Sequence, residues 1–210
     1  MPVIVAFGDS NTWGYDPSTG GRFPRARRWV SVLQRELGAD FEVIAEGLNG
    51  RTTVHDDPIE PYRCGADALP PCLMTHVPVD LVILALGCND LKKRFSVSAF
   101  DIAEGAARLI FLARAYGIGP DGRPPKILLI APPPIAKLTN YAEMFEGGRE
   151  KSVLLGQRYR EVAEREGVTF LDAGSVIRCS DLDGIHYEAD QHELLGLAAA
   201  KAVRGALAAS

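Results

Sequence analysis

The chain has 210 residues, 47% of them hydrophobic and 24% charged, which is the balance of a folded globular protein rather than a disordered or fibrous one. This length supports one compact domain over residues 1–210 and is too short for two domains of ordinary size. Lys and Arg number 23 against 27 Asp and Glu, which gives a net charge of -4. No strong basic field is present, so a nucleic-acid partner is not expected.

The apolar runs are short and the cysteines are scattered. Residues 79–86 are far too few to span a bilayer, so no membrane partner is expected. Residues 1–7 have neither the basic region nor the small-residue cleavage site of a signal peptide, and we therefore expect a cytoplasmic location. No Cys-x-x-Cys spacing occurs, and free thiols are expected at Cys64, Cys72, Cys88 and Cys179.

Five short aliphatic runs predict β-strands. Because these runs are apolar throughout rather than alternating, both faces of the sheet should be covered, as in a parallel sheet. The strands are expected at residues 3–7, 41–45, 80–86, 126–130 and 168–171.

Helical patterns lie between several of these strands. Apolar residues recur with helical spacing over 102–113, after a start at Ser98 and Asp101 that resembles a capping box. The same spacing appears over 155–162, and an Ala- and Leu-rich final helix is expected over about 190–208. Five strands in βαβ succession predict an α/β fold, a doubly wound three-layer α/β/α sandwich around a flavodoxin-like parallel sheet.

Two segments lack clear periodicity, residues 15–28 and 132–148. Both follow the carboxyl ends of predicted strands, where open α/β sheets place their binding sites. They are either ordinary surface loops or the walls of a pocket, and both interpretations stay open at this point.

A serine follows the first predicted strand almost at once, in Gly8-Asp9-Ser10. This position places its hydroxyl at the carboxyl edge of the sheet and near the start of a helix, where unpaired N–H groups favour a developing anion. The segment is not the Gly-x-Ser-x-Gly elbow of α/β-hydrolases. Taken alone, such a serine is more often a helix cap than a nucleophile.

The spacing of Asp183 and His186 changes that interpretation. A serine nucleophile needs a base, and the imidazole needs a group that fixes its tautomer and stabilises the imidazolium. Three residues apart in a turn-rich loop, the two side chains can lie on one side of the chain, and this loop should reach the same sheet edge as Ser10. The alternative is a turn role for Asp183 and a cap or surface role for His186. With Ser10 present, catalysis is favoured.

Two further blocks follow the second and third predicted strands. Gly50 ends one of them, and a glycine lets its backbone N–H approach a substrate oxygen. Asn89 lies in the other and offers a side-chain amide. With the Ser10 N–H they would form an oxyanion hole, each donor being worth about 10²–10³ in rate. Alternatively, Gly50 only makes a turn and Asn89 only caps one.

As a set, these blocks resemble the SGNH (GDSL-type) hydrolase superfamily in order and role, over essentially the whole chain. Neighbouring phrases at 9–14, 46–53 and 145–148 are similar to its arylesterase/acyltransferase (perhydrolase-type) branch. The resemblance implies the SGNH hydrolase fold. It implies Ser10 as nucleophile, His186 as base and Asp183 as its partner, with Ser10, Gly50 and Asn89 as the oxyanion hole.

Two residues depart from the family pattern. Asn11 stands where the GDSL motif has leucine, and Cys88 stands where many relatives have threonine. Neither change removes a catalytic group, so they affect the expected substrate preference rather than the mechanism. Cys88 is expected to be a small buried packing residue.

The resemblance implies a serine esterase that hydrolyses short-acyl esters through an acyl-enzyme, without a cofactor. Transfer of the acyl group to alcohols or peroxide and assembly into a homo-oligomer are also implied. The partner is then a small-molecule ester, and the residues expected to bind it are Trp13, Tyr15, Asn49 and Phe145. The alternatives are a carbohydrate-acetyl or lipid esterase, and a non-catalytic flavodoxin-like binding domain in which Ser10 caps a helix.

The remaining polar residues show no site pattern. His55, His76 and His192 have no convergent spacing with other ligand types, so no metal site is expected and the three should be surface or capping groups. The arginines within residues 22–28 lack a glycine-rich phosphate loop, so a solvated loop or subunit contact is expected there.

Overall fold

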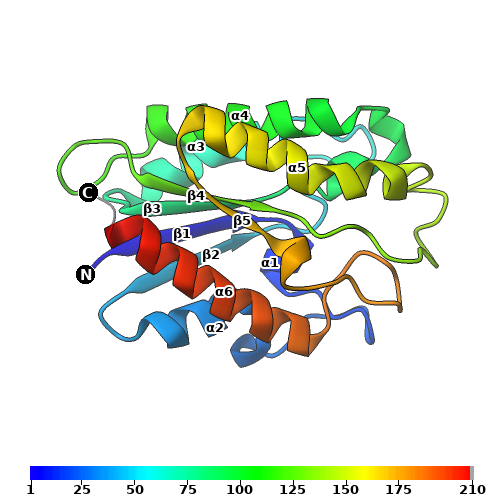
Figure 1. Ribbon diagram of the computed structural model, residues 1–210, viewed down its shortest axis with the longest axis horizontal. Helices are drawn as coiled ribbons and strands as arrows, with labels where there is room; N and C mark the ends of the chain where they lie inside the picture. Colours follow the sequence, from blue (N-terminus) through cyan, green and yellow to red (C-terminus); the bar gives the residue numbers. More distant parts are fainter. Residues whose placement is uncertain (209–210) are drawn as a thin grey trace.

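The computed structural model describes residues 1–208, which form one parallel sheet between two layers of helices (Figure 1). The sheet order is β2-β1-β3-β4-β5, with every neighbouring pair parallel. This confirms the predicted doubly wound α/β/α sandwich, and the strand ends lie close to their predicted positions. The strands are β1 (Val3–Gly8), β2 (Glu42–Gly47), β3 (Leu81–Ala85), β4 (Lys126–Ala131) and β5 (Thr169–Asp172).

The helices divide between the two faces of the sheet (Figure 1). One face is covered by α3 (Gly65–His76), α4 (Ala99–Tyr116) and α5 (Gly148–Glu166). The other is covered by α2 (Trp29–Leu37) and α6 (Ala189–Ala208). The shorter helices are α1 (Ser10–Trp13), η1 (Arg25–Arg27), η2 (Asn89–Leu91), η3 (Lys93–Phe95) and η4 (Ala173–Ser175).

Two of these helices were not predicted, α2 and α3. Helix α3 contains Pro70 and Pro71, which remove backbone donors and normally argue against a helix interior. The predicted capping box at the start of α4 is confirmed: Ser98 Oγ accepts from the Asp101 N–H at 3.2 Å, and Asp101 Oδ2 accepts from the Ser98 N–H at 3.0 Å.

Each face of the sheet has its own apolar core, which explains the continuous aliphatic runs. Along β1, Val5 and Phe7 belong to the core beneath α3, α4 and α5, whereas Ile4 and Ala6 belong to the core beneath α2 and α6. Successive side chains of a strand point to opposite faces, so a strand buried on both sides needs an apolar residue at every position. Burying two such layers fixes the ends of the strands, which carry the site.

The strand order reverses between β1 and β3. In open α/β sheets this switch point opens a crevice at the carboxyl ends of the strands, where ligands bind. The segments that follow β1 and β3 begin there, and they contain Ser10 and Asn89. Within residues 1–208, no helix is both long and apolar enough to cross a membrane.

Candidate active site

Ser10 is the first helical residue of α1, directly after the turn that ends β1. The residue that caps this helix is Asp9, whose Oδ1 accepts from the Asn11 N–H at 2.9 Å. The alternative in which Ser10 is the cap is therefore wrong, and its hydroxyl is free for another partner. The turn requires Gly8, because a Cβ there would lie 2.1 Å from Thr12 Oγ1.

Asp183 and His186 lie in the loop between η4 and α6, and their spacing brings the two side chains together as predicted. Asp183 Oδ1 accepts from the N–H groups of Ile185 and His186, at 2.8 and 2.9 Å. Its Oδ2 lies 2.6 Å from His186 Nδ1. The expected turn role and the expected pairing role thus coexist, since one oxygen closes the turn and the other holds the ring.

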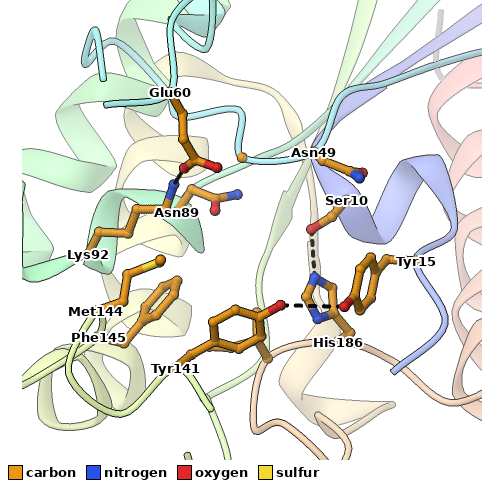
Figure 2. Close-up of a pocket in the computed structure, with 12 residues that line it drawn as sticks. Ser10, Tyr15, Asn49, Glu60, Asn89, Lys92, Tyr141, Met144, Phe145 and His186 are labelled. Carbon is orange, nitrogen blue, oxygen red and sulfur yellow. Dashed lines mark hydrogen bonds and ion pairs between the residues drawn. The ribbon is translucent and has the colours of Figure 1, made fainter. Parts of the chain in front are cut away.

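The other ring nitrogen of this histidine, Nε2, lies 2.9 Å from Ser10 Oγ (Figure 2). The three side chains of Ser10, His186 and Asp183 are buried, so their hydrogen bonds form largely out of solvent. Burial would raise the pKa of Asp183, but the hydrogen bonds from the ring and backbone of His186 outweigh it and hold this pKa below its usual value. An ionised carboxylate accepts from Nδ1–H, which leaves Nε2 able to take a proton from the serine.

Asn11, one of the two departures from the family pattern, lies outside the pocket and braces the histidine loop. Its Oδ1 accepts from the Tyr187 N–H at 3.1 Å, and its Nδ2 donates to the Ile185 carbonyl at 3.4 Å. These two partners flank His186 on either side. Cys88, the other departure, is buried in the core beneath α3, α4 and α5, as expected of a packing residue.

The three expected oxyanion donors line one pocket: Ser10, Gly50 and Asn89. The Asn89 amide is oriented by two acceptors, since its Nδ2 donates to the Arg51 carbonyl at 3.2 Å and to Asp9 Oδ2 at 3.4 Å. Gly50 has a φ of +79°, a conformation that favours glycine, so its expected turn role holds as well.

The pocket has a volume of about 210 Å³ and is walled by both of the aperiodic segments (Figure 2). Tyr15 comes from the first segment, and Tyr141, Met144 and Phe145 come from the second. The pocket-wall interpretation of these loops is therefore the correct one. Tyr15, Asn49 and Phe145, three of the four residues expected to bind substrate, line this pocket.

The expectation for Trp13 is wrong. It is not among the lining residues; its indole is covered by the Arg22 guanidinium, 4.5 Å from the ring centroid, and Arg22 Nε donates to the Trp13 carbonyl at 2.7 Å. The side chain is therefore occupied with residues 15–28, and Tyr15 reaches the pocket instead. This contact also gives Arg22 a packing role that the sequence did not indicate.

Sequence reasoning missed five lining residues. Glu60 follows β2, Lys92 follows β3, and both lie in stretches without a motif. The only available signal was their position after strand ends. The missed residues are Glu60, Lys92, Tyr141, Met144 and Ile185.

Two tyrosines hold the histidine ring. The ring of Tyr15 lies over His186 with centroids 3.9 Å apart and an interplanar angle of 30°. Tyr141 meets the same imidazole edge-on at 6.0 Å, and the two tyrosine hydroxyls are 3.4 Å apart. An aromatic face this close fixes the ring plane and favours a positive charge on the imidazole.

Asp9 is a buried carboxyl beside the site. Burial raises its pKa to about 6, although the Asn11 N–H acts in the opposite direction. Because the folded-state value exceeds the model value of 3.8, the folded protein binds this proton more tightly than the unfolded chain does. Stability from this group is therefore present at low pH and is lost as pH rises through about 4 to 6.

Replacing Asp9 with asparagine should stabilise the protein at neutral pH. The amide keeps the capping oxygen for Asn11 but carries no charge that burial penalises, so the free energy of unfolding should rise by about 2–3 kcal/mol at pH 7.5. The gain should vanish near pH 4, where the wild-type carboxyl is protonated. Urea unfolding at both pH values measures this, with exposed Asp40→Asn as control; an equal change at both pH values would contradict it.

His192 is buried, so the surface interpretation is wrong for it and the capping one is right. Its Nδ1 accepts from the Trp29 N–H at 3.3 Å, at the start of α2, where Arg28 offers no side-chain cap. Burial lowers the pKa of His192 to about 4, so the ring stays neutral and can accept this bond. The spacing concealed this because α6 and α2 are distant in sequence.

The structure also brings Glu46, Cys72 and His76 together, with ligand atoms within 4.8 Å of one another. Glu46 lies on β2 and the other two on α3, so no spacing motif revealed the group. His76 Nε2 and Glu46 Oε1 form a 2.9 Å pair. Burial raises the pKa of the Cys72 thiol to about 12, and a protonated thiol is a weak ligand. We therefore assign no metal to it.

Fold and site together define a carboxylic ester hydrolase of the SGNH type. The chain belongs to the GDSL-like lipase/acylhydrolase family, whose model matches residues 6–194. The predicted superfamily is therefore confirmed.

Solved structures point to the same class. The native M. smegmatis aryl esterase is 43% identical over 98% of this chain and 100% of its own, with a TM-score of 0.94. A carbohydrate acetylesterase family member from Sinorhizobium meliloti is 42% identical over 99% of this chain and 100% of its own, also with a TM-score of 0.94. These matches confirm the resemblance to the arylesterase branch.

A curated relative matches a shorter part of the chain. Over 54 residues, 24% of this chain, the sequence is 35% identical to the uncharacterized lipoprotein YqeF of Bacillus subtilis (strain 168). The match covers only 20% of that lipoprotein's length. It therefore contributes no functional inference, and the expected cytoplasmic location stays a prediction.

Proposed function

We propose that this hydrolase cleaves short-acyl carboxylic esters through an acyl-enzyme on Ser10. The observation that carries the proposal is the buried relay from Ser10 Oγ to His186 Nε2 at 2.9 Å and from His186 Nδ1 to Asp183 Oδ2 at 2.6 Å. Nucleophile, base and orienting carboxylate need this connectivity.

In the proposed reaction, Ser10 Oγ attacks the ester carbonyl while His186 Nε2 takes the hydroxyl proton. The carbonyl oxygen becomes an oxyanion, held by the N–H groups of Ser10 and Gly50 and by the Asn89 amide. The tetrahedral intermediate collapses, and the alcohol leaves with the proton from His186. Water then attacks the acyl-enzyme by the same route in reverse and restores the hydroxyl.

The preference for short acyl groups is supported by the size of the pocket. Its volume of about 210 Å³ lies below the roughly 300–1,000 Å³ of sites that hold drug-sized ligands. Met144, Phe145 and Ile185 supply apolar surface for a short chain. The same surface disfavours water, which supports acyl transfer to an added alcohol as a second outcome of the acyl-enzyme.

A carbohydrate acetylesterase is the second candidate, because a structure described by that name is 42% identical to this chain and the pocket wall includes the polar Glu60 and Lys92. A non-catalytic binding domain is disfavoured, since Asp9 rather than Ser10 caps α1. A single domain over residues 1–210, a homo-oligomer and a cytoplasmic location all stay predictions.

A panel of p-nitrophenyl esters of increasing acyl length tests the proposal. We expect the highest kcat/KM for acetate or propionate and a fall of about tenfold or more by octanoate, because the longer chain outgrows the pocket. Product analysis in aqueous alcohol measures the share of acyl transfer. Activity confined to long acyl chains would contradict the short-acyl proposal, and exclusive hydrolysis would remove the transfer claim.

A further inference from the structure

A buried charge cluster lies behind one wall of the pocket, and the catalytic relay does not use it. Lys92 is only 3% exposed, yet its side chain carries an ammonium group. Its Nζ lies 3.2 Å from Asp57 Oδ2 and also contacts Glu60 Oε2. Arg94 Nη1 completes the cluster, 2.9 Å from Asp57 Oδ1. Two cations and two carboxylates balance, so the cluster adds no net charge to the site.

Asp57 is the fixed anchor of this cluster. Burial would raise its pKa, but the backbone N–H groups of Ile59 and Glu60, with Arg94 and Lys92, outweigh burial and hold that pKa well below its usual value. Asp57 therefore stays ionised and keeps Lys92 paired whether or not Glu60 takes part. A buried ammonium that is anchored in this way is preorganised to bind a ligand.

Glu60 and Lys92 also form part of the pocket surface. Both are lining residues, and Figure 2 shows them on the side opposite His186 and Tyr15, beyond Asn89. Glu60 is close to the reacting centre, because a Cβ built on Gly50 would lie 3.5 Å from Glu60 Oε2. The pair thus borders the expected oxyanion hole.

The pair offers one acceptor and one donor side by side. Glu60 uses Oε2 for Lys92, and within residues 1–208 no protein donor reaches its Oε1. The Lys92 ammonium has three N–H groups and two carboxylate partners, Asp57 and Glu60, in the same described part of the chain. One acceptor oxygen and one N–H therefore remain for a ligand.

The charge balance selects the chemistry of that ligand. A cation bound at Glu60 would be repelled by Lys92, and an anion bound at Lys92 would be repelled by Glu60 and Asp57. A neutral hydroxyl can donate to Glu60 Oε1 and accept from Lys92 Nζ at once. We propose that the Glu60–Lys92 pair is a subsite for a hydroxyl group carried by the ester substrate.

This subsite rests on the proposed esterase function and names its substrate class, hydroxylated short esters. The leaving oxygen must lie near His186 Nε2 to receive its proton. Because Glu60 and Lys92 lie across the pocket from that ring, the hydroxyl is expected on the acyl part of the ester.

The test uses two isosteric ester pairs and the variant Glu60→Leu. In one pair the hydroxyl is on the acyl group, ethyl 3-hydroxybutyrate against ethyl 3-methylbutyrate. In the other it is on the alcohol, 2-hydroxyethyl acetate against propyl acetate. The variant removes the acceptor, while Asp57 still pairs Lys92. Glu146→Leu, at an exposed glutamate paired with Lys93 outside the pocket, is the matched control. Glu60→Ala replaces the leucine variant if that one fails to fold.

We expect Glu60→Leu to lower the kcat/KM ratio of hydroxylated to hydroxyl-free ester by about tenfold or more in the acyl pair, with no change in Glu146→Leu. A fall in the alcohol pair alone keeps the subsite but moves the hydroxyl to the leaving group. An unchanged ratio in both pairs, or an equal loss on all four esters, overturns the subsite. Wild-type protein inactive on all four esters and on p-nitrophenyl acetate contradicts the esterase proposal itself.

Discussion

Replacing Ser10 with alanine should lower kcat for p-nitrophenyl acetate by about 10⁵- to 10⁶-fold, the effect of removing the nucleophile from a serine triad. The hydroxyl is the only atom lost, and its recorded partner is His186 Nε2. Asp9 still caps α1, so the fold should persist and the unfolding midpoint should stay close to that of the wild type. Initial rates and thermal unfolding, measured on the same preparation, separate the two effects.

Ser18→Ala is the matched control for this experiment. Ser18 is exposed and its Oγ bonds Asp16 rather than a ring, so the same chemical change there should leave kcat unaltered. Turnover within about tenfold of wild type in a folded Ser10→Ala protein would place the nucleophile elsewhere.

Replacing Asp183 with asparagine should lower kcat by about 10⁴-fold while the loop keeps its shape. The amide oxygen can still accept from the N–H groups of Ile185 and His186, which close the turn. The amide nitrogen, however, would face His186 Nδ1, where the carboxylate now lies at 2.6 Å. A donor there favours the tautomer with its proton on Nε2, and that ring cannot take a proton from Ser10.

Asp181→Asn controls for the change of an acid to an amide in the same loop. Asp181 is exposed and two positions from the relay, so its variant should retain wild-type kcat. The pH–rate profile and kcat of both variants, with KM measured alongside, test the tautomer explanation. A loss carried by KM alone in Asp183→Asn would contradict it, because the carboxylate would then act in binding.

The triad and the sheet were predictable because their signals are local. A strand buried on both faces must be apolar throughout, and β1 and β3 show this directly in the sequence. Asp183 and His186 are close in sequence, so their pairing needs only a turn. The convergence of Ser10 with His186 then follows from topology, since both follow strands whose carboxyl ends share one edge.

The rest of the site depends on loop packing, which leaves little trace in sequence. Trp13 was assigned to the pocket from its position in a motif, but Arg22 covers it and Tyr15 takes the place beside His186. Lys92 has no periodic or motif context, and only the folded chain shows that it is buried against Asp57. Long-range contacts of this kind require the coordinates.

The most direct test is the mass of the intact protein during turnover. Rapid mixing with p-nitrophenyl acetate and acid quenching should trap one acetyl group per chain, and peptide mapping should place it on Ser10. The Ser10→Ala protein, mixed in the same way, should remain unmodified. Sustained wild-type turnover with no trapped adduct, or an adduct on another residue whose loss abolishes activity, would contradict an acyl-enzyme at Ser10.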